Sequence, residues 1–371
     1  MAKIDTKLPK GMRDFLPEEV LKREYVFGVI TDVFQSCGFE PIHTPVLEMQ
    51  ETLLGKYGED AEKLIFFAQH PGGKEELALR YDLSVPLSRY VAMNENDLTF
   101  PFRRYHIAPV WRAERPQRGR YREFYQCDVD IAGIKDVSAD AEIVNVVSTA
   151  LRRLGFEDFT ININNRKILN GIGVYAGVPD AQLGSLYRSI DKLDKIGLDG
   201  VKAELAENGI ADDVITRMMN LLELRAGTVE SLGHLREQLD GIPSAEEGID
   251  ELLEMADYMG AMGVPAENIS LDFAMVRGLS YYTGPIYETI ITKPRNLGSV
   301  TGGGRYDELI GLFRSQSLPL TGSSLGIERI IDLMDELDLY PPAVARTVVQ
   351  CVVTVFDKST QAESLKLANE L

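Results

Sequence analysis

The densest group of residues able to do chemistry is an arginine-rich segment in the first third of the chain. Five arginines lie within 112–122, with Glu114 as the one acid among them, namely Arg112, Arg115, Arg118, Arg120 and Arg122. Pro116 and Gly119 predict a turn, and so a hairpin with an arginine loop. Guanidinium groups bind phosphate oxygens, and Phe124 offers a face on which a base could stack. The segment favours a nucleotide site, and the alternative is a solvated loop with arginines at its strand ends.

Two glycine-rich segments are weaker signals. GGGRYDEL (302–309) fits neither a Walker loop nor a dinucleotide fingerprint, so its glycines indicate close approach of backbone to a ligand or another strand. In GSSLGIERI (322–330), Glu328 and Arg329 fall in the first turns of a predicted helix. Arg329 could reach a triphosphate there, or the two could form a surface ion pair.

Two further segments carry polar residues on predicted strands. In VRGLSYYTG (276–284), alternation puts Arg277 and Tyr281 on one face and Tyr282 on the other, unless Gly278 bends the strand. In LALRYDLSVPLSRY (77–90), Arg80 and Asp82 share a face at a strand end, either as a site or as a salt bridge.

The elements that must position these residues form an α+β pattern. Short alternating segments over 64–132 predict antiparallel strands. Helices are predicted over 17–37, 83–94 and 139–155, a strand over 159–165, almost continuous helix over 166–262, and strands again over 269–292. The two groups of strands are thus separated by an α-helical insertion.

The tail predicts the start of another domain. Residues 348–356 form an apolar, β-branched run typical of a strand buried on both faces. Thr360 and Glu363 fit a capping box that opens a helix running to Leu371. Because one strand and one helix cannot bury their own faces, we expect the chain to stop inside a second, α/β domain.

Composition limits the classes of function. The chain has 371 residues, 44% hydrophobic and 26% charged, which is typical of a globular protein. Its net charge of −18 argues against non-specific nucleic-acid binding. Three separated cysteines fit a reducing cytoplasm, and four histidines without ligand spacing predict no zinc site. No apolar run approaches the length of a membrane span.

In this order and spacing, the segments resemble the class II aminoacyl-tRNA synthetases and, among them, the histidyl-tRNA synthetase family. KGMRDFLP resembles the family's opening motif, TPVLE motif 1, RAERPQRGRYREF motif 2 and GSSLGIERI motif 3. VRGLSYYTG and GGGRYD resemble the two histidine-specific signatures, although Ser280 stands where the family usually has aspartate. The resemblance implies a six-stranded antiparallel sheet flanked by helices.

The resemblance also implies roles for individual residues. Arg112 would bind the α-phosphate of ATP and Arg120 the γ-phosphate. Phe124 would stack under adenine, with Glu114 nearby, and Arg329 would cover its other face. The histidine-binding residues would be Asp82 and Gln126 for the α-ammonium group, Asp130 and Tyr282 for the imidazole, together with Arg277 and Tyr281. Arg277 would stabilise the charge at the α-phosphate during attack, so Arg277 and Arg112 would be the catalytic residues.

The implied reaction activates L-histidine with ATP and transfers it to the 3′ end of tRNA(His). Magnesium would be carried by ATP, with no tightly bound cofactor, and the protein would be a cytoplasmic homodimer. The implied domains are a catalytic unit over 1–165 and 263–340, a helical insertion over 166–262 and the start of a truncated anticodon-binding domain over 346–371. The alternative is the family's paralogue, a histidine-sensing regulatory subunit of ATP phosphoribosyltransferase. The intact Arg112, Arg277 and Arg329 argue against that alternative.

Overall fold

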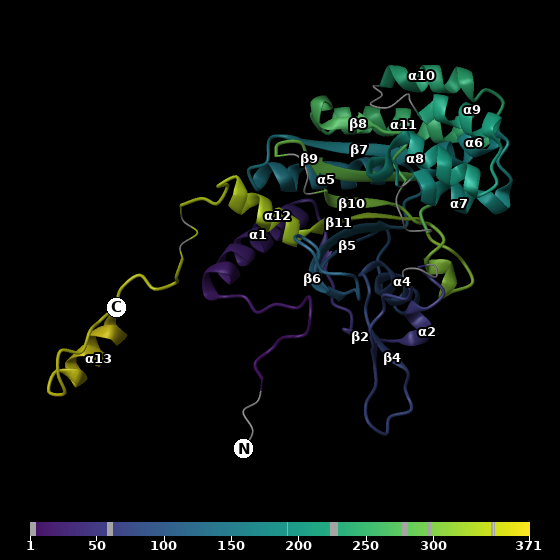
Figure 1. Cartoon of the computed structure of the whole chain (residues 1–371). Coiled ribbons are helices and arrows are strands. Elements are labelled where there is room, and N and C mark those ends of the chain that lie inside the picture. The colour runs from purple at the N-terminus through teal and green to yellow at the C-terminus, as the bar shows by residue number, and fades with distance from the viewer. Residues whose placement is uncertain are drawn as a thin grey trace.

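A large mixed sheet forms the centre of the molecule (Figure 1). The computed structural model describes residues 5–57, 62–190, 192–222, 229–276, 281–294, 298–342, 344 and 346–371. The strand order is β1 (Glu40–Pro41), β5 (Phe102–Trp111), β6 (Glu123–Ala132), β11 (Leu320–Gly326), β10 (Ser299–Arg305), β9 (Pro285–Ile291), β7 (Phe159–Asn165) and β8 (Ile269–Leu271). The six strands from β5 to β7 pair antiparallel, as predicted, and β1 and β8 extend the two edges in parallel.

The β5–β6 hairpin carries the arginine loop. Its register runs from Phe102 opposite Ala132 to Trp111 opposite Glu123, so the predicted hairpin is confirmed. At the turn, the backbones of Gln117 and Arg120 pair as an isolated antiparallel bridge. A small second sheet is formed by β2 (Leu47–Met49), β4 (Leu77–Leu79) and β3 (Phe67–Ala68). In the chain, α2 (Gln50–Leu53) follows β2, and α4 (Ser84–Met93) follows β4.

The helices packed near β6 and β11 come from three separate parts of the described chain. They are α1 (Pro17–Ser36), α5 (Ser138–Arg153) and α12 (Ile327–Glu336). Helix α1 opens with proline at its first position and is followed by Gly38 in the left-handed region, the stop signal read from the sequence. It buries Val26, Ile30 and Phe34 and contacts both α5 and α12.

The described residues between β7 and β8 form six helices, as the helical pattern predicts. They are α6 (Arg166–Ala176), α7 (Asp180–Ile190), α8 (Leu193–Glu207), α9 (Asp212–Leu222), α10 (Val229–Gln238) and α11 (Pro243–Ala261). They gather at the β7–β8 side of the sheet (Figure 1), where α11 packs on α6 and α5. Lys167 joins α6 to α11 through ion pairs of 2.7 Å to Glu247 and 2.6 Å to Glu251.

Parts of the predicted secondary structure are wrong. The strand pattern over 269–292 is interrupted, because residues 272–276 and 281–284 form turns and irregular backbone between β8 and β9. Residues 346–371 contain no strand, and 348–356 is mostly exposed, since the described chain offers it no neighbouring strand. Helix α13 (Gln361–Glu370) does form, but without the capping box: the Thr360 hydroxyl donates to the Asp357 carbonyl at 3.0 Å.

Candidate active site

A cavity of about 620 Å³ opens on one face of the sheet. Its lining comes from β6, β10, β11, the arginine loop, the first turn of α12 and residues 81–84. All of the predicted site residues that the structure describes line it: Asp82, Arg112, Glu114, Arg120, Phe124, Gln126, Asp130, Tyr281, Tyr282 and Arg329. Arg277 and Ser280 lie outside the described residues.

Strand β6 places three polar side chains in the cavity. Gln126, Asp128 and Asp130 alternate with the buried apolar residues of the strand, so all three reach the same face. Gly322 lies opposite Asp130 on β11, and a Cβ there would be 1.9 Å from the Asp130 Oδ1 atom. The glycine of the GSSLG segment is therefore required by the carboxylate that it faces.

Asp130 is held by two partners. The Arg104 Nη2 atom lies 2.7 Å from its Oδ2 atom, and the Tyr306 hydroxyl donates to its Oδ1 atom. Burial raises the pKa of Asp130, and Arg104 opposes that shift. The sequence reasoning missed both partners, which lie on β5 and directly after β10.

Asp82 lies just before the N-terminus of α4. Its Oδ1 atom accepts from the Tyr57 hydroxyl at 2.9 Å and from the Val85 amide at 3.1 Å. Its buried Oδ2 atom has no hydrogen-bond partner among the described residues. Burial raises the pKa of Asp82, and the Val85 amide and Arg112 oppose the shift. The alternative salt bridge is not formed, because Arg80 donates to the carbonyl oxygens of Thr44 and Pro109, each at 2.9 Å.

The side chain of Gln126, like that of Asp82, has one polar atom that makes a hydrogen bond and one that makes none in the described chain. Its amide nitrogen donates to the Ser324 hydroxyl at 3.0 Å, while its buried Oε1 atom has no partner in the described chain. Asp128 likewise keeps a buried oxygen, Oδ1, without a hydrogen bond there. Because orphaned buried acceptors are costly, these three oxygens are suited to N–H donors of a ligand.

The arginines occupy the other end of the cavity. Arg112 donates to the Tyr81 carbonyl at 3.1 Å, and its guanidinium lies 5.1 Å from the Phe124 ring centre. Arg120 pairs with Glu114 at 3.1 Å while its side chain remains 49% exposed. This end combines a flat aromatic face with cations that solvent can reach.

Arg329 projects from the first turn of α12 toward the arginine loop. It donates to the Ser299 carbonyl, and a Cβ at Gly119 would lie 3.2 Å from its Cγ atom. The surface ion pair with Glu328 does not form. Glu328 is buried and accepts two hydrogen bonds of 2.9 Å from Arg23.

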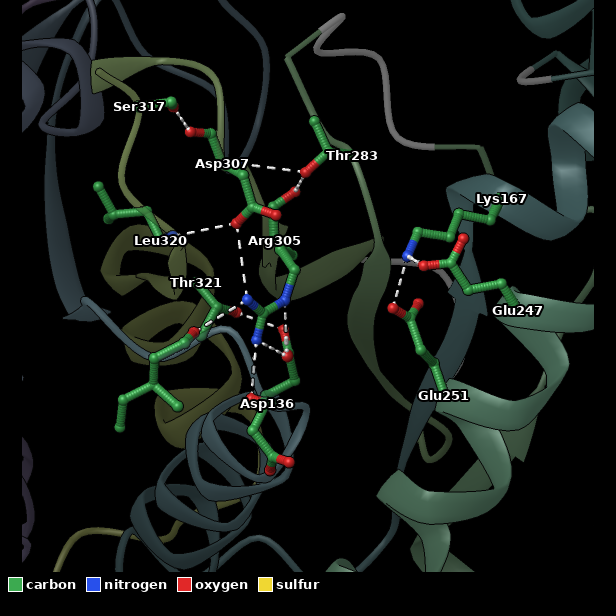
Figure 2. Close-up of polar contacts among 12 residues, drawn as sticks. Asp136, Lys167, Glu247, Glu251, Thr283, Arg305, Asp307, Ser317, Leu320 and Thr321 are labelled. Carbon is green, nitrogen blue, oxygen red and sulfur yellow. Dashed lines mark hydrogen bonds and ion pairs between the residues drawn. The ribbon is translucent and has the colours of Figure 1, made fainter. Parts of the chain in front are cut away.

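The GGGRYD segment fixes Tyr306 through its neighbours. Arg305 is buried and donates to the Asp140 carboxylate and, at 3.0 Å each, to the carbonyl oxygens of Ile134 and Asp136. Figure 2 shows the Arg305 side chain beside Asp136 and Asp307. Asp307 accepts from the Leu320 amide at 3.1 Å, and its own amide donates to Thr283 at 3.2 Å. With both neighbours anchored, Tyr306 points to the opposite side, toward Asp130.

The predicted opposition of Tyr281 and Tyr282 is wrong. Both line the cavity, with ring centres 5.0 Å apart, because this stretch is a turn and not a strand. Tyr281 also packs 5.6 Å from Tyr306. Asp128 and Tyr306 are cavity residues that the sequence reasoning missed. Alternation with Asp130 could have identified Asp128, whereas Tyr306 needed the fold.

Other classes of site are not supported by the described chain. Its residues contain no group of three or more His, Cys, Asp or Glu side chains that could hold a metal ion. Among the helices that the structure describes, none is long and apolar enough to cross a membrane.

Comparisons with known proteins identify the family of this chain. The family model described as histidyl-tRNA synthetase matches residues 11–330. A histidine–tRNA ligase of Bacteroides fragilis is 43% identical over 90% of this chain and 77% of its own length. One from Aeropyrum pernix is 45% identical over 94% of this chain and 79% of its own.

Solved structures extend the comparison. Histidyl-tRNA synthetase from Nostoc sp. PCC 7120 has a TM-score of 0.86 and 32% identity, covering 99% of this chain and 84% of that one. A structure titled an ATP phosphoribosyltransferase regulatory subunit/histidyl-tRNA synthetase from Bacillus halodurans has a TM-score of 0.83 over 99% of this chain and 90% of that one. At 24% identity it shows the fold alone, so the regulatory alternative gains no support. The chain belongs to the histidyl-tRNA synthetase family, and its function is that of a histidine–tRNA ligase.

Proposed function

We propose that this chain activates L-histidine with ATP to form histidyl-adenylate and then transfers histidine to the 3′ end of tRNA(His). The observation that carries the proposal is the convergence of the predicted residues on one cavity with an acidic and a basic end. Arg112 links the two ends, since its charge is close enough to Asp82 to oppose the rise that burial causes in the pKa of that carboxyl. Attack of an amino acid on an α-phosphate needs this adjacency of ammonium and phosphate sites.

ATP, carried with Mg²⁺ as substrate, occupies the basic end. Arg112 binds the α-phosphate and Arg120 the γ-phosphate, where it exchanges its ion pair with Glu114 for phosphate oxygens. Adenine lies between Phe124 and Arg329. The exposed guanidinium of Arg120 and the Phe124 ring beside Arg112 support this assignment.

Histidine occupies the acidic end. Asp82 and Gln126 take the α-ammonium group, which is supported by their orphaned buried oxygens. Asp130 accepts an imidazole N–H, and Tyr282 serves the other ring nitrogen, with Tyr281 packed beside it. A competing amino acid would leave these buried groups unpaired, which is costly enough to reject it.

Arg277 completes the proposal on sequence grounds. In-line displacement at phosphorus is catalysed mainly by positioning and charge neutralisation, and an arginine beside the α-phosphate supplies both. Arg277→Ala should therefore lower kcat far more than it raises KM for histidine. An equal change in both constants would make Arg277 a ground-state binding residue.

Histidine-dependent exchange of pyrophosphate into ATP tests the function. The folded 371-residue chain should catalyse exchange with L-histidine and not without it. Exchange that histidine does not stimulate would refute the proposal.

A homodimer in the cytoplasm is part of the same proposal. Apolar side chains are exposed at the start of α1, where Leu16 and Val20 lie, and on β2, where Leu47 follows Pro45 in the chain. An isologous contact would cover them in both copies. Light scattering should give twice the chain mass at micromolar concentration, and a monomer would refute the dimer.

We also propose 1–165 with 263–340 as the catalytic unit, 166–262 as an inserted unit and 346–371 as part of a further domain.

A further inference from the structure

The N-terminal segment 9–15 contacts both the arginine loop and the start of α12, which together form the basic end of the cavity. It contains the GMRDF residues of the opening motif and no residue that lines the main cavity. The Gly11 carbonyl accepts from the Arg122 amide at 2.9 Å, and the Arg122 carbonyl accepts from the Arg112 amide at 2.9 Å. The segment therefore continues the backbone pairing of the arginine hairpin next to Arg112.

Gly11 fits closely against the arginine loop. Its φ of +82° lies in the left-handed region, and a Cβ there would be 2.8 Å from Pro116 Cγ and 2.9 Å from Arg122 Cγ. Both the backbone conformation and the close contact thus require glycine. The contact sets the separation between the segment and the loop.

Arg13 joins the loop to helix α12. Its guanidinium carbon lies 3.3 Å from the Tyr121 ring centre, and its Nη2 atom pairs with the Glu328 carboxylate. Tyr121 lines the cavity next to Arg120, and Glu328 precedes Arg329. One side chain therefore touches the chain neighbours of two of the three arginines assigned to ATP, Arg120 and Arg329.

Glu328 pairs with a second arginine, Arg23 of α1, in addition to Arg13. Arg23 of α1 is 6% exposed and binds both Glu328 oxygens, so the carboxylate is fixed from two sides. Burial alone would raise the pKa of Glu328, but Arg23 and Arg13 together hold it below its usual range. Because Arg23 secures the start of α12 already, Arg13 is the partner that adds the connection to the loop.

We propose that segment 9–15 is a brace that holds the arginine loop and the start of α12 in the geometry that binds ATP, with Arg13 as a positioning residue. The inference rests on the proposed function only in naming ATP as the ligand. The planar guanidinium stacks on Tyr121 and pairs with Glu328 at once, which a lysine cannot reproduce.

The kinetic test compares Arg13→Gln, Arg13→Lys and Lys10→Gln in the full chain. Lys10 lies in the same segment and is exposed. Lys10→Gln removes one positive charge, as Arg13→Gln does. Arg13→Gln should raise KM for ATP by about ten-fold, with KM for histidine within about two-fold, because one stacked, charge-assisted contact is lost. Arg13→Lys should restore part of the effect, and Lys10→Gln should match the wild type. Equal KM values for ATP in Arg13→Gln and Lys10→Gln would overturn the brace.

Limited trypsin digestion tests the same inference without activity, and so separates it from the proposed function. Arg118 and Arg120 are exposed in the loop. Arg13→Gln should speed cleavage after these residues several-fold without speeding cleavage elsewhere, because the loop loses its restraint. Loop cleavage at the wild-type rate would contradict the proposal even if the exchange assay fails.

A glycine pair covers the case in which Arg13→Gln folds poorly. Gly11→Ala should raise KM for ATP and loop cleavage, whereas Gly72→Ala should change neither. Gly72 has a similar φ of +80°, with nothing within 4 Å of an added Cβ, so it reproduces the strain without the contact. The same effect in both variants would show that the contact with the loop has no role.

Discussion

The acidic and basic ends of the cavity hold their charged side chains in different ways. Asp82 and Asp130 are 2% and 4% exposed, and each accepts a hydrogen bond from a tyrosine. Arg120, in contrast, is half exposed and pairs with one acid across the loop. A small amino acid must be selected by buried groups already in place, whereas a triphosphate brings its own charge and needs cations that can close on it.

The largest effect should follow from a change at the acidic end. Asp130→Asn should lower kcat/KM for histidine by about 1,000-fold, because the acceptor for the imidazole becomes an amide and Arg104 loses the nearer of its two charge partners. KM for ATP should stay within about three-fold. Asp158→Asn is the matched control, since Asp158 is exposed and pairs only with Lys293 in the described chain. A parallel loss of ATP binding would erase the distinction between the two ends.

The basic end should respond in the complementary way. Arg112→Ala should lower the exchange rate by about 100-fold and raise KM for ATP, because a charge-assisted contact to the α-phosphate is lost. Histidine binding measured without ATP should change by less than about three-fold. If histidine binding falls as much as ATP binding, Arg112 belongs to both ends.

The next effect concerns pH and Asp128. Burial raises the pKa of Asp128 to about 7, with Arg104 opposing and Asp130 reinforcing the shift. Its pKa in an unfolded chain is about 3.9, so the folded protein keeps a proton that the unfolded chain loses between about pH 4 and 7. The contribution of this group to stability must therefore fall as pH rises through that window.

Asp128→Asn should remove this dependence. Relative to the wild type, its free energy of unfolding should rise by about 3 kcal/mol between pH 4 and 7. Urea unfolding at several pH values measures the difference, which also cancels the contributions of other buried acids such as Asp140. A constant difference across the window would show that Asp128 is ionised throughout.

The smallest effect is expected at the rim of the arginine loop. Arg118 is 68% exposed and pairs with Glu336 at 3.1 Å. Arg118→Ala should change the free energy of unfolding by less than about 0.5 kcal/mol, since surface ion pairs contribute little. KM for ATP should rise less than about two-fold by the same reasoning. A larger rise would extend the basic end to the loop tip.

Local signals in the sequence predicted much of this arrangement. The alternation of β6 and the turn at Pro116 placed the arginine hairpin correctly, and Gly38 marked the end of α1. These features depend on neighbouring residues only. The prediction that Tyr281 and Tyr282 point to opposite faces of a strand was wrong, because this stretch forms a turn.

Long-range pairing was not accessible from the sequence. The bond between Arg23 and Glu328 joins residues 305 positions apart, and nothing local distinguishes it from the expected surface pair. Tyr306 reaches Asp130 only because Arg305 and Asp307 are anchored on the other side. Residues 348–356 have the composition of a buried strand but no strand to pair with in the described chain.

The most direct test of the two-ended cavity is steady-state pyrophosphate exchange on wild type, Asp130→Asn and Arg112→Ala side by side, with histidine and ATP each varied. We predict that Asp130→Asn changes KM for histidine and leaves KM for ATP near the wild-type value, and that Arg112→Ala does the reverse. Equal changes in both constants for both variants would contradict the account.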